Sequence, residues 1–160
     1  MHSVTSGAVY SKFLQHCFST GIRIDESFSI AYQEGGVWYD NDVWWRVFES
    51  SNKNADYNTM YAEITVINVR YQHHAPNVTK YIVSPNYRTS PQPAVIQLYK
   101  SNASCHGIRI GRDSNNTWYV DLLLFANDYL IFAQGEGFKR STKQAKVDMG
   151  GFSYVSYISN

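Results

Sequence analysis

The sequence contains few of the residues that form covalent or metal-stabilised frameworks. Its 160 residues include four prolines and two cysteines, Cys17 and Cys105. Two cysteines provide neither a disulfide framework nor a paired-cysteine metal site, so we expect two free thiols, with Cys105 in a polar turn. No apolar run reaches the roughly 18 residues that a membrane-spanning helix needs, and no leader resembles a signal peptide. We therefore expect a soluble chain that carries no cofactor.

An excess of one charge is also missing. The 14 basic and 13 acidic side chains are well mixed and leave a net charge of +1. This pattern gives no electrostatic footprint for nucleic acid or for an anionic membrane, so we expect neither nucleic-acid binding nor membrane insertion. The length suits one domain, since a domain of about 150 residues buries about 68–70% of its unfolded surface.

Aromatic residues, by contrast, are abundant. They make up 16% of the chain, with 13 tyrosines and 4 tryptophans. Aromatic side chains suit β-strands, and tyrosine and tryptophan also dominate the contact energy of many interfaces. The surplus therefore favours a β-rich protein with an adhesive surface.

Residues 1–20 predict a short amphipathic helix. Thr5 or Ser6 can serve as the N-cap, and residues 8–18 are compatible with helix. Helices shorter than roughly 12–15 residues are marginal alone, so this one needs a partner, either its own domain or copies of itself. The apolar side chains that recur at helical spacing are Val9, Tyr10, Phe13, Leu14 and Cys17.

After Gly21 the apolar pattern changes to a period of two, which predicts an all-β fold over residues 21–160. Turn residues separate the short runs, as expected of an antiparallel β-sandwich, and about ten strands suit a jelly-roll-like arrangement. The predicted strands are 22–24, 28–32, 37–39, 43–49, 60–71, 80–83, 95–100, 107–110, 118–124, 129–133 and 152–158.

Three segments carry more specific expectations. The strand over residues 60–71 should change environment midway, because its alternation is mixed. The continuous apolarity of residues 122–125 indicates a strand covered on both faces, with a neighbouring subunit or the helix on the outer face. The basic cluster Lys139, Arg140, Lys143 and Lys146 predicts a solvated loop, or alternatively a contact with an anionic bacterial polymer.

The segment Val4-Thr5-Ser6-Gly7-Ala8-Val9-Tyr10 resembles the P-V-[TS]-[SG]-[GA]-V-Y segment of bacteriophage tail-fibre and receptor-binding proteins, with His2-Ser3 where proline is usual. The resemblance implies a C-terminal fibre head in the virion, outside the cell when it acts, with the shaft before residue 1. It also implies a homotrimer held partly by the helix stripe, in contact with other tail proteins and with a bacterial surface glycan or protein.

The candidate ligand site is an acidic turn flanked by aromatics. Aromatic faces stack on sugar rings while carboxylates and amides bond to hydroxyls, so this turn can bind a glycan. The alternative is an ordinary hairpin whose aromatic side chains enter the core. The residues concerned are Trp38, Tyr39, Asp40, Trp44 and Trp45.

His73 and His74 are weak metal candidates. Adjacent residues of an extended segment point to opposite sides, so one chain forms a poor chelate, although a three-fold axis would bring three copies together. The alternative is a solvated loop, and we expect no bound metal.

Catalytic motifs are equally weak. Glycoside hydrolysis needs two carboxylates about 5–10 Å apart, a distance that sequence does not give. A Gly-x-Ser-x-Gly elbow is absent. We expect a non-enzymatic receptor-binding head; the alternatives are a structural virion or baseplate domain, a monomeric carbohydrate-binding module and a depolymerase.

Overall fold

The protein is described here from a computed structural model. It covers residues 23–30, 33–34, 37–38, 42–51, 60–68, 77–85, 92–101, 105–124, 128–145, 147 and 151–159. Within these ranges the regular structure is entirely β. The helix prediction for residues 1–20, including its stripe from Val9 to Cys17, lies outside the described residues.

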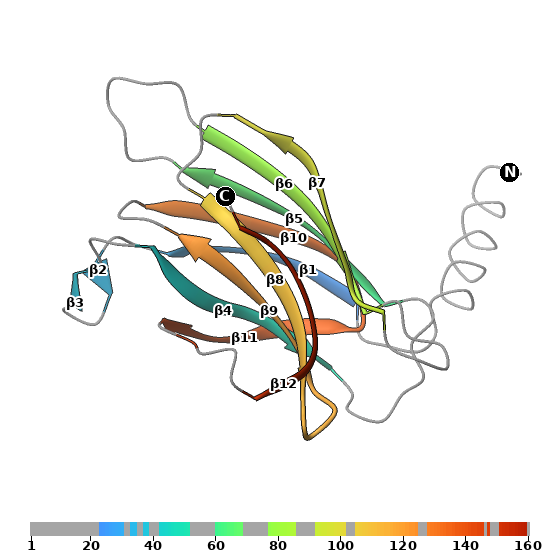
Figure 1. The fold of residues 1–160 in the computed structure, drawn as a ribbon. Helices are drawn as coiled ribbons and strands as arrows, with labels where there is room; N and C mark the ends of the chain where they lie inside the picture. The colour runs from blue at the N-terminus through green and yellow to red at the C-terminus, as the bar shows by residue number, and fades with distance from the viewer. Residues whose placement is uncertain are drawn as a thin grey trace, which may run out of the picture.

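Two five-stranded antiparallel sheets form the body of the protein (Figure 1). The first sheet has the order β1 (Arg23–Ile30), β10 (Tyr129–Glu136), β5 (Tyr61–Asn68), β6 (Asn77–Ser84) and β7 (Ala94–Lys100). The second sheet has the order β11 (Phe138–Ala145), β4 (Val43–Ser50), β9 (Trp118–Leu124), β8 (Cys105–Asp113) and β12 (Phe152–Ser159). A separate short hairpin pairs β2 (Gln33–Glu34) with β3 (Val37–Trp38).

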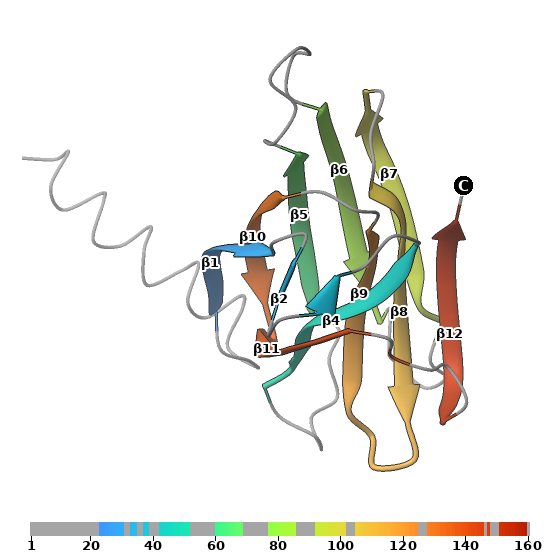
Figure 2. The ribbon, with the colours of Figure 1, turned by 90° about the vertical axis from the view of Figure 1, so that its left-hand side faces the viewer.

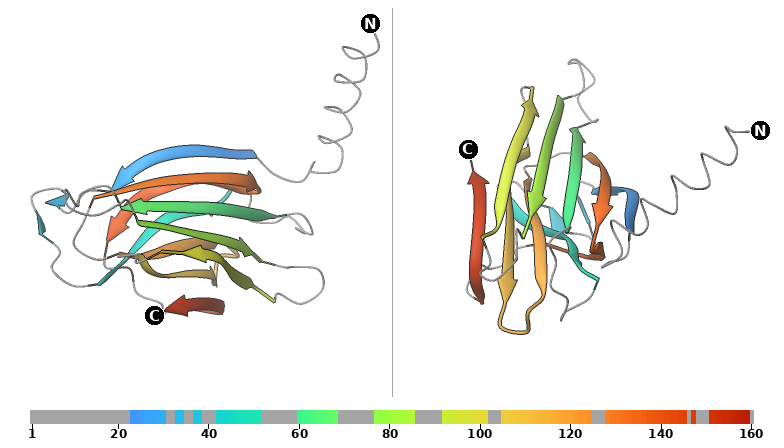
Figure 3. Two further views of the ribbon diagram at one scale, coloured as in Figure 1. Left: turned by 90° about the horizontal axis from the view of Figure 1, so that it is seen from above. Right: turned by 90° about the vertical axis from the view of Figure 1, so that its right-hand side faces the viewer.

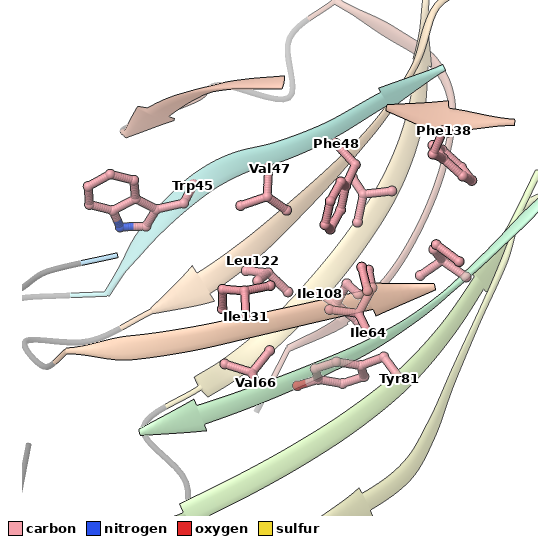
Figure 4. Packing of buried hydrophobic residues seen from close by; sticks show 14 of the residues in the cluster. Trp45, Val47, Phe48, Ile64, Val66, Tyr81, Ile108, Leu122, Ile131 and Phe138 are labelled. Atoms are coloured by element: carbon pink, nitrogen blue, oxygen red, sulfur yellow. The ribbon is translucent and has the colours of Figure 1, made fainter. Parts of the chain in front are cut away.

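The two sheets share one hydrophobic core. On β5 the inward residues Ala62, Ile64 and Val66 are buried and alternate with partly exposed residues. Figure 4 shows side chains of both sheets meeting between the layers. Phe28 of β1 contacts Phe48 of β4 edge to face, with ring centroids 5.8 Å apart. The predicted all-β antiparallel sandwich is therefore confirmed.

The chain passes repeatedly from one sheet to the other (Figures 1 and 3). Successive strands change sheets from β1 to β4 to β5, and again from β9 to β10 to β11. Between these crossings, β5, β6 and β7 form a meander, and β8 and β9 form a hairpin. As a result β7 and β12, the last strands of the two sheets, lie together on one side of the sandwich (Figure 2).

Two local predictions are wrong. The alternation along β5 stays regular from Tyr61 to Asn68, so this strand does not change environment within the described part of 60–71. The basic residues Lys139 and Arg140 belong to strand β11, not to a loop, and both are exposed there. Arg140 places its guanidinium 4.4 Å from the centroid of the Phe28 ring, so its long side chain covers the edge of the core.

Candidate functional site

The aromatic residues of the predicted ligand turn have different environments. Trp38 lies on β3, while Tyr39 and Asp40 lie outside the described residues. Trp44 is half-buried on β4, and the next residue, Trp45, is only 4% exposed and belongs to the core (Figure 4). Trp45 therefore fits the alternative in which the aromatic side chains of the hairpin enter the core. A buried ring offers no face to a ligand in solution. Binding by Trp38, Tyr39, Asp40 and Trp44 stays a prediction.

The metal candidates His73 and His74 also lie outside the described residues. Among the residues that the structure does describe, no three histidine, cysteine or acidic side chains lie close enough together to hold a metal ion. In the same part of the chain, no helix is long and apolar enough to cross a membrane.

A buried cluster of charges lies on the outer face of the second sheet. The strand register places Asp121 of β9 directly between Arg46 of β4 and Arg109 of β8. Arg46 donates to both carboxylate oxygens, with Nε–Oδ1 and Nη2–Oδ2 distances of 3.0 and 3.3 Å. Arg109 Nε donates to Oδ2 at 2.6 Å. Asp121 is 0% exposed and Arg109 is 1% exposed, so the carboxylate is shielded from solvent.

Aromatic rings complete the surroundings of this cluster. The guanidinium carbon of Arg46 lies 4.0 Å from the ring centroid of Tyr119, and that of Arg109 lies 4.3 Å from the ring of Trp44. Phe152 of β12 stacks on Tyr119, with centroids 6.2 Å apart. Partial burial, followed by the nearby Asp113 carboxylate, raises the pKa of Tyr119. Rings facing guanidinium groups stabilise these cations after they have lost water.

The cluster also holds another part of the chain. Val147, which lies between β11 and β12, accepts a hydrogen bond of 2.8 Å from Arg109 Nη2. The Val147 N–H in turn donates to the carbonyl of Trp44 at 3.2 Å. The outer face of β9 is therefore covered by this chain's own arginines and by Val147, where the sequence suggested a subunit or the helix. The burial expected of residues 122–124 is confirmed.

Sequence reasoning considered the carboxylates only as a possible catalytic pair and missed both arginines. The available signal was an acidic residue placed inside a strand of buried apolar residues, Trp118–Leu124. Such a carboxylate needs cationic partners on the neighbouring strands, because an unpaired buried charge is very costly. Asp121 is 0% exposed and both of its oxygens accept from arginines, so it links strands β4, β9 and β8.

Cys105 has a similar structural environment. It was predicted to lie in a polar turn, but it is the first residue of β8 and only 1% exposed. Its Sγ lies 3.6 Å from the hydroxyl of Tyr81. Desolvation by burial raises the pKa of the Cys105 thiol to about 11 and also raises the pKa of Tyr81. The thiol is free, as expected, and this environment makes it unreactive.

One surface pair lies at the start of β4. His106 Nδ1 and Asp42 Oδ1 are 2.7 Å apart, and the two side chains are 31% and 39% exposed. An exposed pair of this kind contributes little to stability, because solvent and salt screen it.

Among the described residues, a groove lies on the outer face of the first sheet. It has a volume of about 460 Å³. Its walls come from β1, β5, β6 and β10. Glu26 belongs to β1, the edge strand of this sheet. The side chains that line it further are Ser27, Glu63, Thr65, Lys80, Phe132 and Gln134.

The strand register explains how these residues meet. Phe132 pairs with Thr65, Thr65 pairs with Lys80, and Gln134 pairs with Glu63 across neighbouring strands. Lys80 Nζ lies 3.6 Å from Glu63 Oε1, with the side chains 42% and 41% exposed. The Phe132 ring is 42% exposed, so it presents an apolar surface among polar groups. This combination of one ring with donors and acceptors is typical of sites that bind polar ligands.

Comparison with known proteins gives no match for this chain. No family model, no curated protein and no solved structure is similar to it.

Proposed function

We propose that this chain is the non-enzymatic, receptor-binding head of a bacteriophage tail fibre. It forms a homotrimer and adheres to the bacterial surface. The observation that carries the proposal is the fibre-like segment Val4–Tyr10, which precedes a two-sheet β domain in the sequence. The sheet-to-sheet crossings of β1, β4 and β5 also support a jelly-roll-like head of the kind that the resemblance implies.

The distribution of charge supports adhesion over catalysis. The deeply buried carboxylate of Asp121 is fully paired with two arginines and has no access to a substrate. The exposed groove instead offers a ring, an amide, hydroxyls and a weak ion pair on one face of a sheet. Such groups bind a ligand without needing to change its covalent bonds.

The two sides of the sandwich differ in a way that supports self-association. One side is formed by the edge strands β1 and β11, which carry charges such as Arg23, Glu26, Lys139 and Arg140. Charges on edge strands prevent unwanted pairing with other chains. The opposite side is formed by β7 and β12, and β12 carries no charged residue.

The side formed by β7 and β12 displays large apolar side chains. We call this surface the side patch and define it as Ile96, Leu98, Tyr99, Val155 and Tyr157. Their exposed fractions lie between 41% and 57%. Large exposed apolar side chains on edge strands are typical of an interface between subunits. The side patch therefore supports assembly of copies of this chain, in addition to the helix stripe expected at residues 9–17.

Three copies would strengthen a weak contact with the host. Linked weak sites raise the avidity by about 10²–10⁴ without any new contact, provided that all can engage at once. A head with one shallow groove per chain suits this mode of binding, because the sites repeat on a bacterial surface.

Binding to intact bacteria tests this function. Fluorescently labelled full-length protein is incubated with a panel of Gram-negative and Gram-positive strains, and cell-bound fluorescence is measured by flow cytometry. We expect saturable binding to a subset of strains, displaced by excess unlabelled protein. Equal, unsaturable fluorescence on all strains, or none on any of them, would contradict a receptor-binding role.

A further inference from the structure

The groove on the outer face of the first sheet has a composition that identifies a class of ligand. We infer that this groove binds a neutral saccharide, with Phe132 beneath the sugar ring and Glu63, Lys80 and Gln134 bonded to its hydroxyls. The inference rests on the proposed function and locates the receptor contact within it.

Phe132 supplies the apolar part of the site. It is 42% exposed at the centre of β10, with β1 on one side and β5 on the other. In the strand register its neighbours are Ser27 and Thr65, two small hydroxyl residues. Small flanking side chains leave the face of the ring accessible. A flat ring of this kind can pack against the C–H face of a sugar, which is apolar.

The polar groups lie to one side of the ring. Gln134 follows Phe132 by two residues on β10, so both side chains leave the same face of the sheet. Gln134 pairs across strands with Glu63, whose carboxylate is 3.6 Å from Lys80 Nζ. Together these side chains provide amide and ammonium donors and carboxylate and amide acceptors. A sugar hydroxyl both donates and accepts, so it can bond to either kind of group.

Glu63 and Lys80 can give up part of their contact with each other and form hydrogen bonds to ligand hydroxyls at low cost. Both side chains of the Glu63–Lys80 pair are more than two-fifths exposed. Exposed pairs of this kind contribute little to stability, so replacing part of the contact with hydrogen bonds to a ligand costs little.

The charge of the groove selects against acidic ligands. Two carboxylates, Glu26 and Glu63, line it against the single ammonium group of Lys80. A phosphate or uronate group would meet a net negative surface, and like charges placed together disfavour binding. A hydroxyl-rich ligand without acidic groups therefore fits the groove.

The sheet beneath the groove is rigid. The same strands bury Ile64, Tyr81 and Ile131 on their inner face, each 0% exposed. Side chains carried by packed strands are held more firmly than those on loops, which lowers the entropy lost on binding. The groove is thus formed before a ligand arrives.

The experiment measures binding of neutral trisaccharides of glucose, galactose, mannose and N-acetylglucosamine, with tri-galacturonate as the acidic probe. Titration calorimetry is performed on the full chain and on Phe132→Ala and Leu130→Ala. Leu130 is the matched control, because it is 37% exposed on the same strand and lies outside the groove lining. We expect at least one neutral trisaccharide to bind, with an affinity at least tenfold weaker in Phe132→Ala and unchanged in Leu130→Ala.

Three results would overturn the inference: binding of tri-galacturonate alone, no binding of any neutral probe, or equal affinity in Phe132→Ala and the native chain. Circular dichroism verifies that both variants fold. If Phe132→Ala does not fold, the double variant Glu63→Gln, Gln134→Ala provides a second disruption of the groove. The cell-binding assay separates the two proposals. Saturable cell binding that persists in Phe132→Ala refutes the groove and leaves the receptor-binding role intact.

Discussion

Replacing Asp121 by asparagine tests the role of the buried charge cluster most sharply. The substitution preserves the size of the side chain but removes the negative charge between Arg46 and Arg109. Both guanidinium groups would then be left without a counter-ion, and Arg109 is only 1% exposed. Stacking on Trp44 and Tyr119 offsets part of this cost but does not neutralise the charge.

The expected loss is large relative to the stability of a domain of this size. Removing one partner of a buried ion pair costs about 3–5 kcal/mol, because the remaining charge has neither water nor a counter-ion. Domains are stable by only about 5–15 kcal/mol, so the variant would lose a substantial fraction of its free energy of unfolding. At about 2–4 °C for each kcal/mol, the melting temperature should fall by about 6–20 °C.

Urea denaturation at one fixed protein concentration measures this loss. Glu63→Gln is the matched control, since it breaks the exposed pair with Lys80 and should cost less than about 1 kcal/mol. An apolar triple variant with Arg46→Met, Arg109→Met and Asp121→Leu should recover much of the stability lost in Asp121→Asn, because it leaves no unpaired charge. A loss in Asp121→Asn no greater than that in Glu63→Gln would refute the reasoning.

Four further predictions concern buried groups and the side patch. Thr79→Val should raise the free energy of unfolding by about 1 kcal/mol, because Thr79 is 0% exposed and its hydroxyl lacks a partner among the described residues; a clear loss in urea denaturation would contradict this. Labelling by iodoacetamide at pH 8 tests the burial of Cys105, with Cys17→Ser removing the other thiol. The native chain should react at least about 100-fold more slowly than the urea-unfolded chain. Equal labelling rates would be inconsistent with burial. Since the folded thiol keeps its proton to about pH 11 and the unfolded thiol releases it near pH 9.0, the contribution of Cys105 to stability should be lost as pH rises through this window. Tyr157→Lys should reduce the solution mass by weakening subunit contacts, whereas Leu130→Lys, outside the side patch, should not; an equal effect of both would exclude a specific interface.

The sequence predicted much of the β architecture because strands with one buried face have a clear period of two. The predicted strand 118–124 matches β9, and 43–49 matches all but the last residue of β4. Strand β11, an edge strand, was missed. Its run Phe138–Ala145 carries three basic residues, and charges that protect an edge also resemble a solvated loop.

The candidate sites were harder to predict, because they depend on which strands become neighbours. The groove joins residues near positions 27, 64, 80 and 133, which only the pairing of β1, β10, β5 and β6 brings together. The partners of Asp121 are likewise 75 and 12 residues away along the chain. Period and turn signals identify individual strands, whereas sheet order depends on the free energy of the whole fold.

The central claim is that this chain is one third of an adhesive head, and its mass in solution tests the assembly directly. Multi-angle light scattering is performed on the full chain and on a chain that begins at Gly21. A trimer has a mass of about 55 kDa, three times the 18.3 kDa of one chain, and we expect it to lose subunits or to dissociate more readily without residues 1–20. Monomers for both chains, at 18.3 kDa for the full chain and correspondingly less for the chain that begins at Gly21, would rule out this assembly.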